Sequence, residues 1–336
     1  GIAAFLFMVH TDYHRLAEKR VLRLAVLLTT VLLLLTFVPP FGGKINGAYR
    51  WLTWGPISVQ PSELAKFVLV VWLAVSLTVH QDKITHFGQG FVLPFCLAGF
   101  FVSIVLVQRD IGIPFVMLTA TFAMVWVAGG RLRYLLGSCA ICLAGGIMLI
   151  IMQPYRLVRI YALIDPWKYR ETIGFQLIQS LVALSQGGFW GRGPGASEQK
   201  LGCLPAADTD FIFATLGEEF GLIGTMTTVA LFLGILYIAL RICANAPDLF
   251  GALLGVGITV LLLIQTAFII AVTVGIAPTK GLPLPFISYG GSALTVSLLM
   301  MGVLVNIGIR GALAKPEPDK KITVLPWSLL RKPMHS

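Results

Sequence analysis

Eight stretches of this sequence are apolar over the length that a helix needs to cross a lipid bilayer. The stretches cover residues 21–38, 61–79, 88–107, 112–128, 134–152, 212–240, 249–275 and 288–309. A hydrocarbon core about 30 Å thick requires roughly 20 apolar residues in a helix, and lipid leaves the backbone groups of irregular chain unsatisfied. The stretches do not alternate polar with apolar residues, as the strands of an outer-membrane barrel do. The sequence therefore predicts an all-α, polytopic integral membrane protein.

The overall composition supports the same class. Of the 336 residues, 57% are hydrophobic and 12% are charged, whereas an ordinary soluble protein is about 25% charged. A water-soluble enzyme, a disordered chain and a disulfide-rich secreted module are therefore excluded. The formal charge of +10 is typical of loops that orient a membrane protein and contact anionic lipid. No basic run with interleaved aromatic residues accompanies this charge, so we expect no nucleic-acid partner.

Lys and Arg in the loops predict the orientation of the chain. The more basic loops, which we place in the cytoplasm, are 11–20, 80–87, 129–133, 241–248 and the tail 311–336. The loops that then face outward are 39–60, 108–111, 153–211 and 276–287. The outer loops hold dense clusters of Gly, Pro, aromatic and acidic residues, and long loops are usually functional. We therefore expect the chemistry on the extracytoplasmic face.

The chain reads as one transmembrane domain over residues 1–310. Residues 153–211 are its large extracytoplasmic loop, and residues 311–336 are a basic cytoplasmic tail. No inverted repeat or pair of interrupted helices marks a transporter. Residues 1–9 are apolar but too short to span a bilayer, and the chain begins at Gly1. We therefore expect at least half of a helix to lie upstream.

Asp210 is the sharpest candidate for chemistry. It lies where a polar segment enters the apolar stretch that follows Phe211. One interpretation is a helix N-cap, whose side chain accepts a hydrogen bond from a backbone N–H of the first turn. The other is a carboxylate whose pKa partial burial raises into the range of a general base. Asp208, two residues earlier, is a second candidate for that role.

Two outer segments place charges at the expected starts of helices. Pro61 followed by Glu63 is typical of the first turn of a helix. Lys66 lies three residues after Glu63 on the same helix face, where the two side chains can pair. In the very short turn before the fourth stretch, Arg109 and Asp110 are expected to pair with each other or to cap the next helix.

Other outer signals leave two interpretations open. Arg50 and Trp51 are either an interfacial anchor at the lipid headgroups or a functional pair. A glycine series allows the backbone to bend and to approach an anion closely, although no Gly-Lys-Ser/Thr follows it, as a Walker loop requires. The series comprises Gly187, Gly188, Gly191, Gly193 and Gly195.

Taken in order, the outer motifs resemble the SEDS family, whose members include FtsW, RodA and SpoVE. The motifs are Asn46-Gly47, Arg50-Trp51, Gln60-Pro-Ser-Glu-x-x-Lys66, Asp165-Pro166, Gln176 with Gln179-Ser180, Gly187-Gly188 with Gly191-x-Gly193, Leu204-Pro205, Thr209-Asp210-Phe-Ile-Phe-Ala214, Glu218-Glu219 and Pro283-Leu-Pro-Phe-Ile-Ser-Tyr-Gly-Gly-Ser292. The resemblance implies a ten-helix membrane fold, of which the first helix and part of the second would be missing here. Pro278-Thr279-Lys280-Gly281 is more similar to FtsW than to RodA.

The resemblance also implies roles for individual residues. Asp210 matches the family's essential aspartate. Ala206 and Asp208 stand where the family usually has Glu and His, while Asp210 itself is unchanged. The implied substrate-binding residues are Arg50, Trp51, Gln176, Gln179, Lys200, Lys280 and Ser288. The implied structural or supporting residues are Glu63, Lys66, Asp165, Glu218 and Glu219.

The activity implied by the resemblance is polymerisation of lipid II into peptidoglycan glycan strands in the bacterial cytoplasmic membrane, together with a class B penicillin-binding protein and other division or elongation proteins. We expect one inverting displacement, with Asp210 as the general base and Arg50, Lys200 and Lys280 as cations at the pyrophosphate. A RodA-type elongation polymerase, a lipid II flippase and a non-catalytic scaffold are the alternatives.

The sequence predicts no resident metal site, although a divalent cation, Mg²⁺ or Mn²⁺, could assist the pyrophosphate. Cys139 and Cys142 form a Cys-x-x-Cys pattern inside an apolar stretch. No second pair lies nearby, so this pattern favours helix packing over metal binding.

Overall fold

Helices overlap every one of the eight apolar stretches in the computed structural model, which describes residues 1–43, 47–55, 57–199 and 204–314. In chain order the helices are α1 (Ile2–His10), α2 (Lys19–Leu35), α3 (Pro61–Val79), α4 (Leu93–Val107), α5 (Gly112–Val127), α6 (Leu132–Ile151), α7 (Pro154–Ile164), α8 (Gly174–Gly187), α9 (Ile212–Ala244), α10 (Leu249–Thr273) and α11 (Gly291–Leu313). Within the described residues, α3, α4 with its preceding π-helical turn, α9, α10 and α11 are long and apolar enough to cross a membrane. The prediction of a helical, polytopic membrane protein is confirmed.

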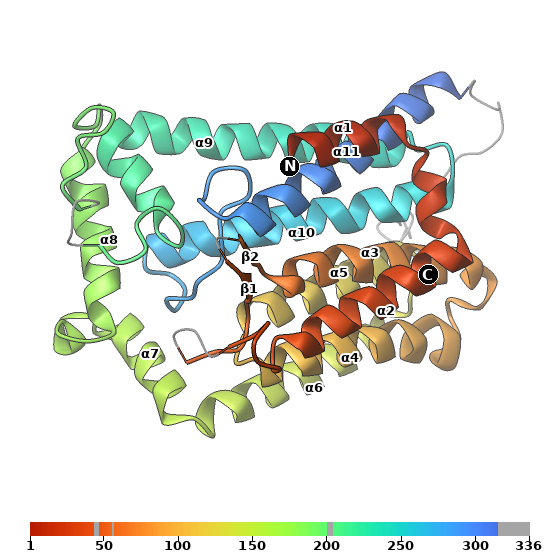
Figure 1. The fold of residues 1–336 in the computed structure, drawn as a ribbon, viewed down its shortest axis with the longest axis horizontal. Coiled ribbons are helices and arrows are strands. Elements are labelled where there is room, and N and C mark those ends of the chain that lie inside the picture. Colours follow the sequence, from red (N-terminus) through yellow and green to blue (C-terminus); the bar gives the residue numbers. More distant parts are fainter. Residues whose placement is uncertain (44–46, 56, 200–203, 315–336) are drawn as a thin grey trace, which may run out of the picture.

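The structure departs from the predicted loops in two outer segments. The segment 153–211 contains α7 and α8, which are shorter than a span and lie across one end of the bundle (Figure 1). In α7, Arg156 and Arg159 recur among apolar residues, a pattern typical of a helix at an interface. The segment 39–60 contains an antiparallel hairpin of β1 (Leu52–Trp54) and β2 (Ile57–Val59), the one sheet in the described part of the chain.

The centre of the bundle is α10, which packs against α3, α5 and α9. Most of its side chains are buried, and a helix that is apolar on all sides is typical of such a central position. The short helix α1 packs along α11 instead of spanning on its own (Figure 1). The predicted tail 311–336 begins inside α11, and from residue 315 onward it lies outside the described residues.

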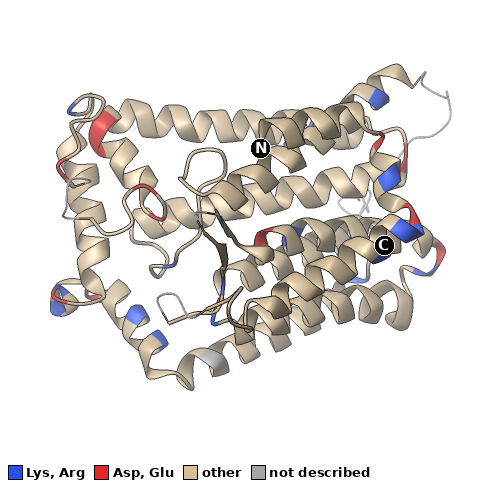
Figure 2. Cartoon of the chain, viewed as in Figure 1, with Lys and Arg blue, Asp and Glu red and all other residues tan. Residues whose placement is uncertain are grey.

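Charged residues gather at the two ends of the bundle, and the middles of the helices carry few of them (Figure 2). This distribution follows from the cost of placing a charge in hydrocarbon. Glu63 and Lys66, in the first two turns of α3, are charged and yet fully buried. Such residues have to be paired, and their contacts are described with the site below.

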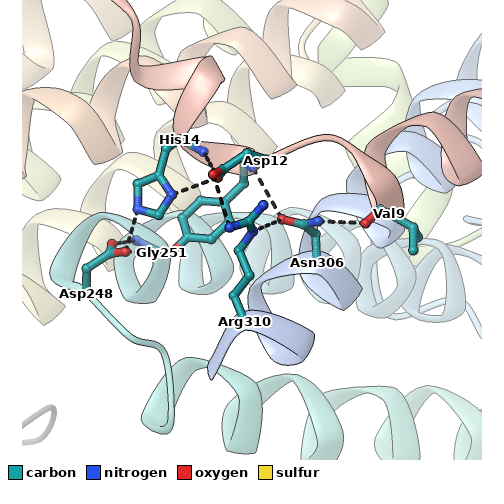
Figure 3. A network of polar contacts seen from close by, with 8 residues as sticks. Val9, Asp12, His14, Asp248, Gly251, Asn306 and Arg310 are labelled. Carbon is teal, nitrogen blue, oxygen red and sulfur yellow. Dashed lines mark hydrogen bonds and ion pairs between the residues drawn. The ribbon is translucent and has the colours of Figure 1, made fainter. Parts of the chain in front are cut away.

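A polar network at the end of the bundle opposite α7 and α8 fastens the N-terminal segment to α10 and α11 (Figure 3). His14 lies between two carboxylates, with Nδ1 2.7 Å from Oδ1 of Asp12 and Nε2 2.8 Å from Oδ2 of Asp248. Asp248 also caps α10, because its Oδ1 accepts a hydrogen bond of 2.6 Å from the N–H of Gly251. Arg310 of α11 pairs with Asp12 at 3.1 Å. These contacts hold α1 in place at the side of the bundle.

Candidate active site

Segments that are predicted to face outward, and that are far apart in the sequence, meet at the end of the bundle covered by α7 and α8. Arg50, which precedes β1, has its Nε 3.5 Å from Oδ2 of Asp110, in the turn between α4 and α5. Lys280, in the segment between α10 and α11, has its Nζ 3.6 Å from Oδ1 of the same carboxylate. Arg159 of α7 donates a hydrogen bond to the carbonyl of Thr279. The loops predicted to share one face therefore converge on one cluster of charges.

Asp110 is the buried anion of this cluster, with its side chain 1% exposed. Its Oδ1 accepts a hydrogen bond of 2.9 Å from the N–H of Gly112, the first residue of α5, while the N-cap position of that helix is Ile111. Its ion pairs are with Arg50 and Lys280 and not with the neighbouring Arg109. The Arg109 carbonyl instead accepts a hydrogen bond of 2.6 Å from the Arg50 guanidinium. Two cations held beside one carboxylate leave this end of the bundle locally positive.

Asp210 lies in the turn that leads into α9. The N-cap position of α9 is Phe211, and no side chain makes a capping hydrogen bond there, so the N-cap interpretation of Asp210 is wrong. The Ala206 carbonyl closes the turn by accepting hydrogen bonds from the N–H groups of Thr209 and Asp210. A Cβ atom at Gly281 would lie 2.6 Å from Oδ2 of Asp210. The carboxylate therefore rests against the backbone of Gly281, next to Lys280.

The surroundings of Asp210 change its acidity. Burial raises the pKa of the Asp210 carboxyl above its ordinary value; Arg50, Arg159 and Lys280 act in the opposite direction, and Asp110 adds to the rise. Burial also lowers the pKa of Lys280 to about 8, against the effect of Asp110. A carboxyl group of raised pKa beside a lysine of lowered pKa is typical of sites that do proton chemistry near neutral pH.

Ser288 connects the segment between α10 and α11 to the turn that carries Asp210. Its hydroxyl donates a hydrogen bond of 2.6 Å to the Thr209 carbonyl and accepts one of 2.7 Å from the N–H of Leu284. The N–H of Tyr289 donates a second hydrogen bond across the same boundary, 2.9 Å to the Asp208 carbonyl. Ser288 thus positions the backbone next to Asp210, and its predicted contact with substrate stays a prediction.

The predicted ion pair of Glu63 and Lys66 is formed in the first two turns of α3. The helix α3 begins at Pro61, as predicted, and Nζ of Lys66 lies 2.9 Å from Oε2 of Glu63. Lys66 also donates a hydrogen bond of 2.6 Å to Oε1 of Gln265 on α10. Gln265 in turn donates a hydrogen bond of 2.6 Å from Nε2 to the Pro283 carbonyl. A buried ion pair is therefore connected to the outer segment that contains Lys280.

The acidic pair at the start of α9 holds the preceding loop. Glu218 is fully buried, and its carboxylate accepts hydrogen bonds of 2.5 Å from the Ser197 hydroxyl and 3.1 Å from the N–H of Glu198. Glu219 contributes its backbone carbonyl, which accepts a hydrogen bond of 3.0 Å from the N–H of Gly193. These contacts are of the supporting kind that the resemblance implied.

The other predicted residues that the structure describes have fewer contacts than those above. Asp165 is exposed, and its side chain accepts a hydrogen bond of 3.2 Å from the N–H of Lys168, which stabilises the turn after α7. Trp51 and Gln176 are half-buried, and Lys200 lies outside the described residues. Gln179 lines an open hollow together with Trp167, Arg170, Glu171, Phe175 and Ile178. The binding roles of Trp51, Gln176, Gln179 and Lys200 stay predictions, as does the supporting role of Asp165.

Two glycines of the series, Gly187 and Gly191, serve close helix packing, which the sequence does not predict. Gly188, Gly193 and Gly195 have positive φ with no atom within 4 Å of an added Cβ, so they bend the backbone, as predicted. Gly187, at the end of α8, approaches the backbone of α9 so closely that a Cβ atom would lie 1.9 Å from the Gly217 carbonyl oxygen. Gly191 has φ +80°, and a Cβ atom there would lie 2.2 Å from the Glu219 carbonyl oxygen. Only glycine fits such positions. Gly187 and Gly191 thus bring the loop 188–199 against α9.

We expect Gly191→Ala to lower the free energy of unfolding by about 1–3 kcal/mol, since it adds a steric overlap to a left-handed backbone. Thermal unfolding of the purified protein in detergent measures this effect. The matched control is Gly145→Ala in α6, where no atom lies within 4 Å of the added Cβ. The control should be neutral or slightly stabilising. Equal stability of Gly191→Ala and the wild-type protein would contradict the packing role.

Several residues of the cluster were not assigned a binding or catalytic role from the sequence. For Asp110 the sequence predicts only local pairing or capping, and Arg159 belongs to an amphipathic helix within the segment 153–211, which the sequence predicts as a loop. Gln265 was part of an apolar stretch. A lone amide inside a membrane helix is a signal of function in itself, and that signal could have identified Gln265.

Known proteins resemble this chain in sequence and in fold. A sequence profile of the FtsW, RodA and SpoVE proteins, described as "Cell cycle protein", matches residues 1–311. The chain belongs to this family. The resemblance inferred from the outer motifs is therefore confirmed, and the converging loops described above are those of an FtsW/RodA/SpoVE protein.

Similar proteins of the FtsW/RodA/SpoVE family include curated and solved examples. A "probable peptidoglycan glycosyltransferase FtsW" from a Geobacter species is 43% identical over 302 residues, which are 90% of this chain and 82% of the relative. Stage V sporulation protein E from Bacillus subtilis is 38% identical over 307 residues, 91% of this chain and 83% of the relative.

Two solved structures have the same fold as this FtsW/RodA/SpoVE chain. One is a chain described under "Structural coordination of polymerization and crosslinking by a peptidoglycan synthase complex". It matches with a TM-score of 0.76 and 27% identity, and the match covers 92% of this chain and 86% of that chain. The other is the rod shape determining protein RodA of Thermus thermophilus, with a TM-score of 0.63, 27% identity and coverage of 92% and 83%. Both similarities extend over most of the bundle.

Proposed function

We propose that this protein is a peptidoglycan glycosyltransferase that polymerises lipid II into glycan strands for septal cell-wall synthesis. The observation that carries the proposal is the half-buried carboxylate of Asp210. It is held against Gly281 and beside Lys280, at the end of the bundle covered by α7 and α8. The names of the relatives support a glycosyltransferase, and several of those relatives are named FtsW. A RodA-type elongation role uses the same chemistry and is the alternative within the family.

The reaction is a single displacement at a sugar carbon. The 4-hydroxyl of a GlcNAc on one lipid-linked chain attacks C1 of the MurNAc on another, and the C1–O bond to undecaprenyl pyrophosphate breaks. An α-linked pyrophosphate gives a β-1,4 bond, so the configuration inverts in one step. The hydroxyl proton passes to the carboxylate of Asp210, and the electron pair of the broken bond leaves with the pyrophosphate.

Cations near Asp210 suit the departure of the pyrophosphate. Arg50 and Lys280 already lie beside the Asp110 carboxylate, and Arg159 acts electrostatically on Asp210. Preorganised positive charge in a site of low dielectric stabilises an anion that forms in the transition state. In the described residues, no three His, Cys, Asp or Glu side chains gather as a metal-binding group. Each step proposed here uses side chains of this protein, and assistance by a divalent cation stays a prediction.

The membrane location and the partner are part of the same proposal. We place the end of the bundle that carries Asp210 and Lys280 on the extracytoplasmic face of the bacterial cytoplasmic membrane, as the loop charges predict. The solved relative from a peptidoglycan synthase complex supports a complex with a class B penicillin-binding protein, which crosslinks the strands. Other division proteins stay predicted partners.

The test is polymerisation of labelled lipid II by the purified protein, with and without a class B transpeptidase. We expect glycan strands to form, and a liposome assay in parallel measures translocation of lipid II between leaflets. Translocation without polymer would favour the flippase alternative, and neither activity would favour a non-catalytic scaffold. A full-length relative serves as the positive control.

We expect kcat/KM for polymerisation to have a bell-shaped dependence on pH. Asp210 must be deprotonated to act as a base, so activity falls as pH decreases through its raised pKa. Lys280 must be protonated to act as a cation, so activity falls as pH increases through about 8. In Lys280→Arg the alkaline limb should move to higher pH, because arginine stays charged. An alkaline limb unchanged in Lys280→Arg would exclude Lys280 as its source.

A further inference from the structure

Gln265 connects the buried ion pair of Glu63 and Lys66 in α3 to the segment between α10 and α11 that lies beside Asp210. We propose that Gln265 is a positioning residue for the polymerisation reaction, which holds residues 279–290 and through them sets the place of the Asp210 carboxylate. The proposal rests on the proposed function, because it assumes that Asp210 is the base. Gln265 itself is buried within the bundle and touches no substrate in this proposal.

The ammonium group of Lys66 fixes the orientation of the Gln265 amide. An ammonium has only hydrogen-bond donors, so the atom that faces it at 2.6 Å must be the amide oxygen. The amide NH₂ then points the other way, where Nε2 lies 2.6 Å from the Pro283 carbonyl. Glu63 in turn holds Lys66 in place, with 2.9 Å between the charged groups. The direction of the hydrogen bond to Pro283 is thus determined by the ion pair.

The chain of contacts continues from Pro283 to Asp210. The peptide that carries the Pro283 carbonyl also carries the N–H of Leu284, which donates a hydrogen bond of 2.7 Å to the Ser288 hydroxyl. The Ser288 hydroxyl donates a hydrogen bond of 2.6 Å to the Thr209 carbonyl, in the peptide that joins Thr209 to Asp210. Each contact is between groups that are buried or half-buried.

The same outer segment contacts the carboxylate from a second side. Gly281 lies against Asp210, and Lys280 acts electrostatically on it. A shift of residues 279–290 would therefore move the charge beside Asp210 and the backbone that precedes Asp210 together. A misplacement of about 1 Å far from the reacting atoms can lower a rate by about 10²-fold, so the hydrogen bond to Pro283 is in a position to control kcat.

The sharpest variant is Gln265→Glu. A glutamate keeps the shape of the side chain and an oxygen for Lys66, and as a carboxylate beside that ammonium it has no hydrogen to donate to the Pro283 carbonyl. Gln265→Leu removes both contacts. The matched control is Thr266→Val, which removes a buried hydroxyl of the same helix whose hydrogen bond goes only to the Leu262 carbonyl within α10.

Two measurements test the proposal in the full chain. Hydrogen exchange should show loss of protection at the amides of Leu284 and Tyr289 in both Gln265 variants and not in Thr266→Val. Polymerisation of labelled lipid II should show kcat lowered by about 10–10²-fold in both Gln265 variants, with KM nearly unchanged and Thr266→Val like the wild type. This combined result supports Gln265 as a positioning residue.

Other results overturn the proposal. Unchanged exchange at both amides would mean that Gln265 does not hold the segment. Lost protection with an unchanged kcat, or with a change in KM alone, would mean that the segment does not set the place of the base. Asp210→Asn and the wild-type protein are measured alongside. If Asp210→Asn polymerises like the wild type, the assignment of Asp210 as the base fails, and if the wild-type protein forms no polymer, the proposed function fails. In either case the exchange measurement still decides whether Gln265 holds the segment.

Discussion

Asp210→Asn should lower the rate of lipid II polymerisation by at least about 10²–10⁴-fold, the usual contribution of general acid–base catalysis. The amide is nearly the same shape as the carboxylate, but it cannot accept the proton of the attacking hydroxyl. The carboxylate makes no N-cap bond to α9, so the substitution should leave the fold intact. Polymer formation from labelled lipid II by purified variants, quantified on gels, measures the loss.

Two controls separate the loss of a base from a general loss of structure. Asp82→Asn changes an exposed carboxylate in the short helical turn that follows α3, and it should polymerise normally. Thermal unfolding of Asp210→Asn should match the wild-type protein within experimental scatter. An Asp210→Asn variant that forms polymer at the wild-type rate would remove the assignment of Asp210 as the base.

Lys66→Met should lower the free energy of unfolding by about 3–5 kcal/mol, the cost of leaving one buried partner of an ion pair uncompensated. Lys66 and Glu63 are 1% and 2% exposed at their side chains, with 2.9 Å between the charged groups. Without the ammonium, the Glu63 carboxylate would lie buried with no cation, and Gln265 would lose the donor that orients its amide. Thermal or denaturant unfolding in detergent micelles measures the change.

The double variant Glu63→Gln/Lys66→Met provides the control for this second effect. It removes both charges, so most of the lost stability should return, as replacement of a whole buried pair is often neutral. A double variant no more stable than Lys66→Met would mean that packing around Lys66, and not the uncompensated charge, causes the loss. A single variant as stable as the wild type would contradict the pairing itself.

Local patterns account for what could be predicted of the fold. Apolar stretches of about 20 residues become helices because lipid admits few other backbones, and α3, α4, α9, α10 and α11 follow the predicted stretches closely. The start of α3 at Pro61 and the pairing of Glu63 with Lys66 follow from spacing within one turn. The helices α7 and α8 and the hairpin were not predicted, because their apolar faces are too short to stand out from a polar loop.

The sequence by itself determined the class of protein, the helices of the long apolar stretches and the family, and it predicts a role for Asp210, since each depends on hydropathy or on motifs that are continuous in the chain. Only the tertiary structure decided which charges meet. Asp110 forms ion pairs with Arg50 and Lys280 and not with the adjacent Arg109. Gln265 connects α3 to the segment between α10 and α11. The bond from Gln265 to Pro283 spans 18 positions, and the other contacts join residues about 60 to 200 positions apart. The longer separations are closed by the packing of α3, α5, α9 and α10 around one another and not by any local pattern.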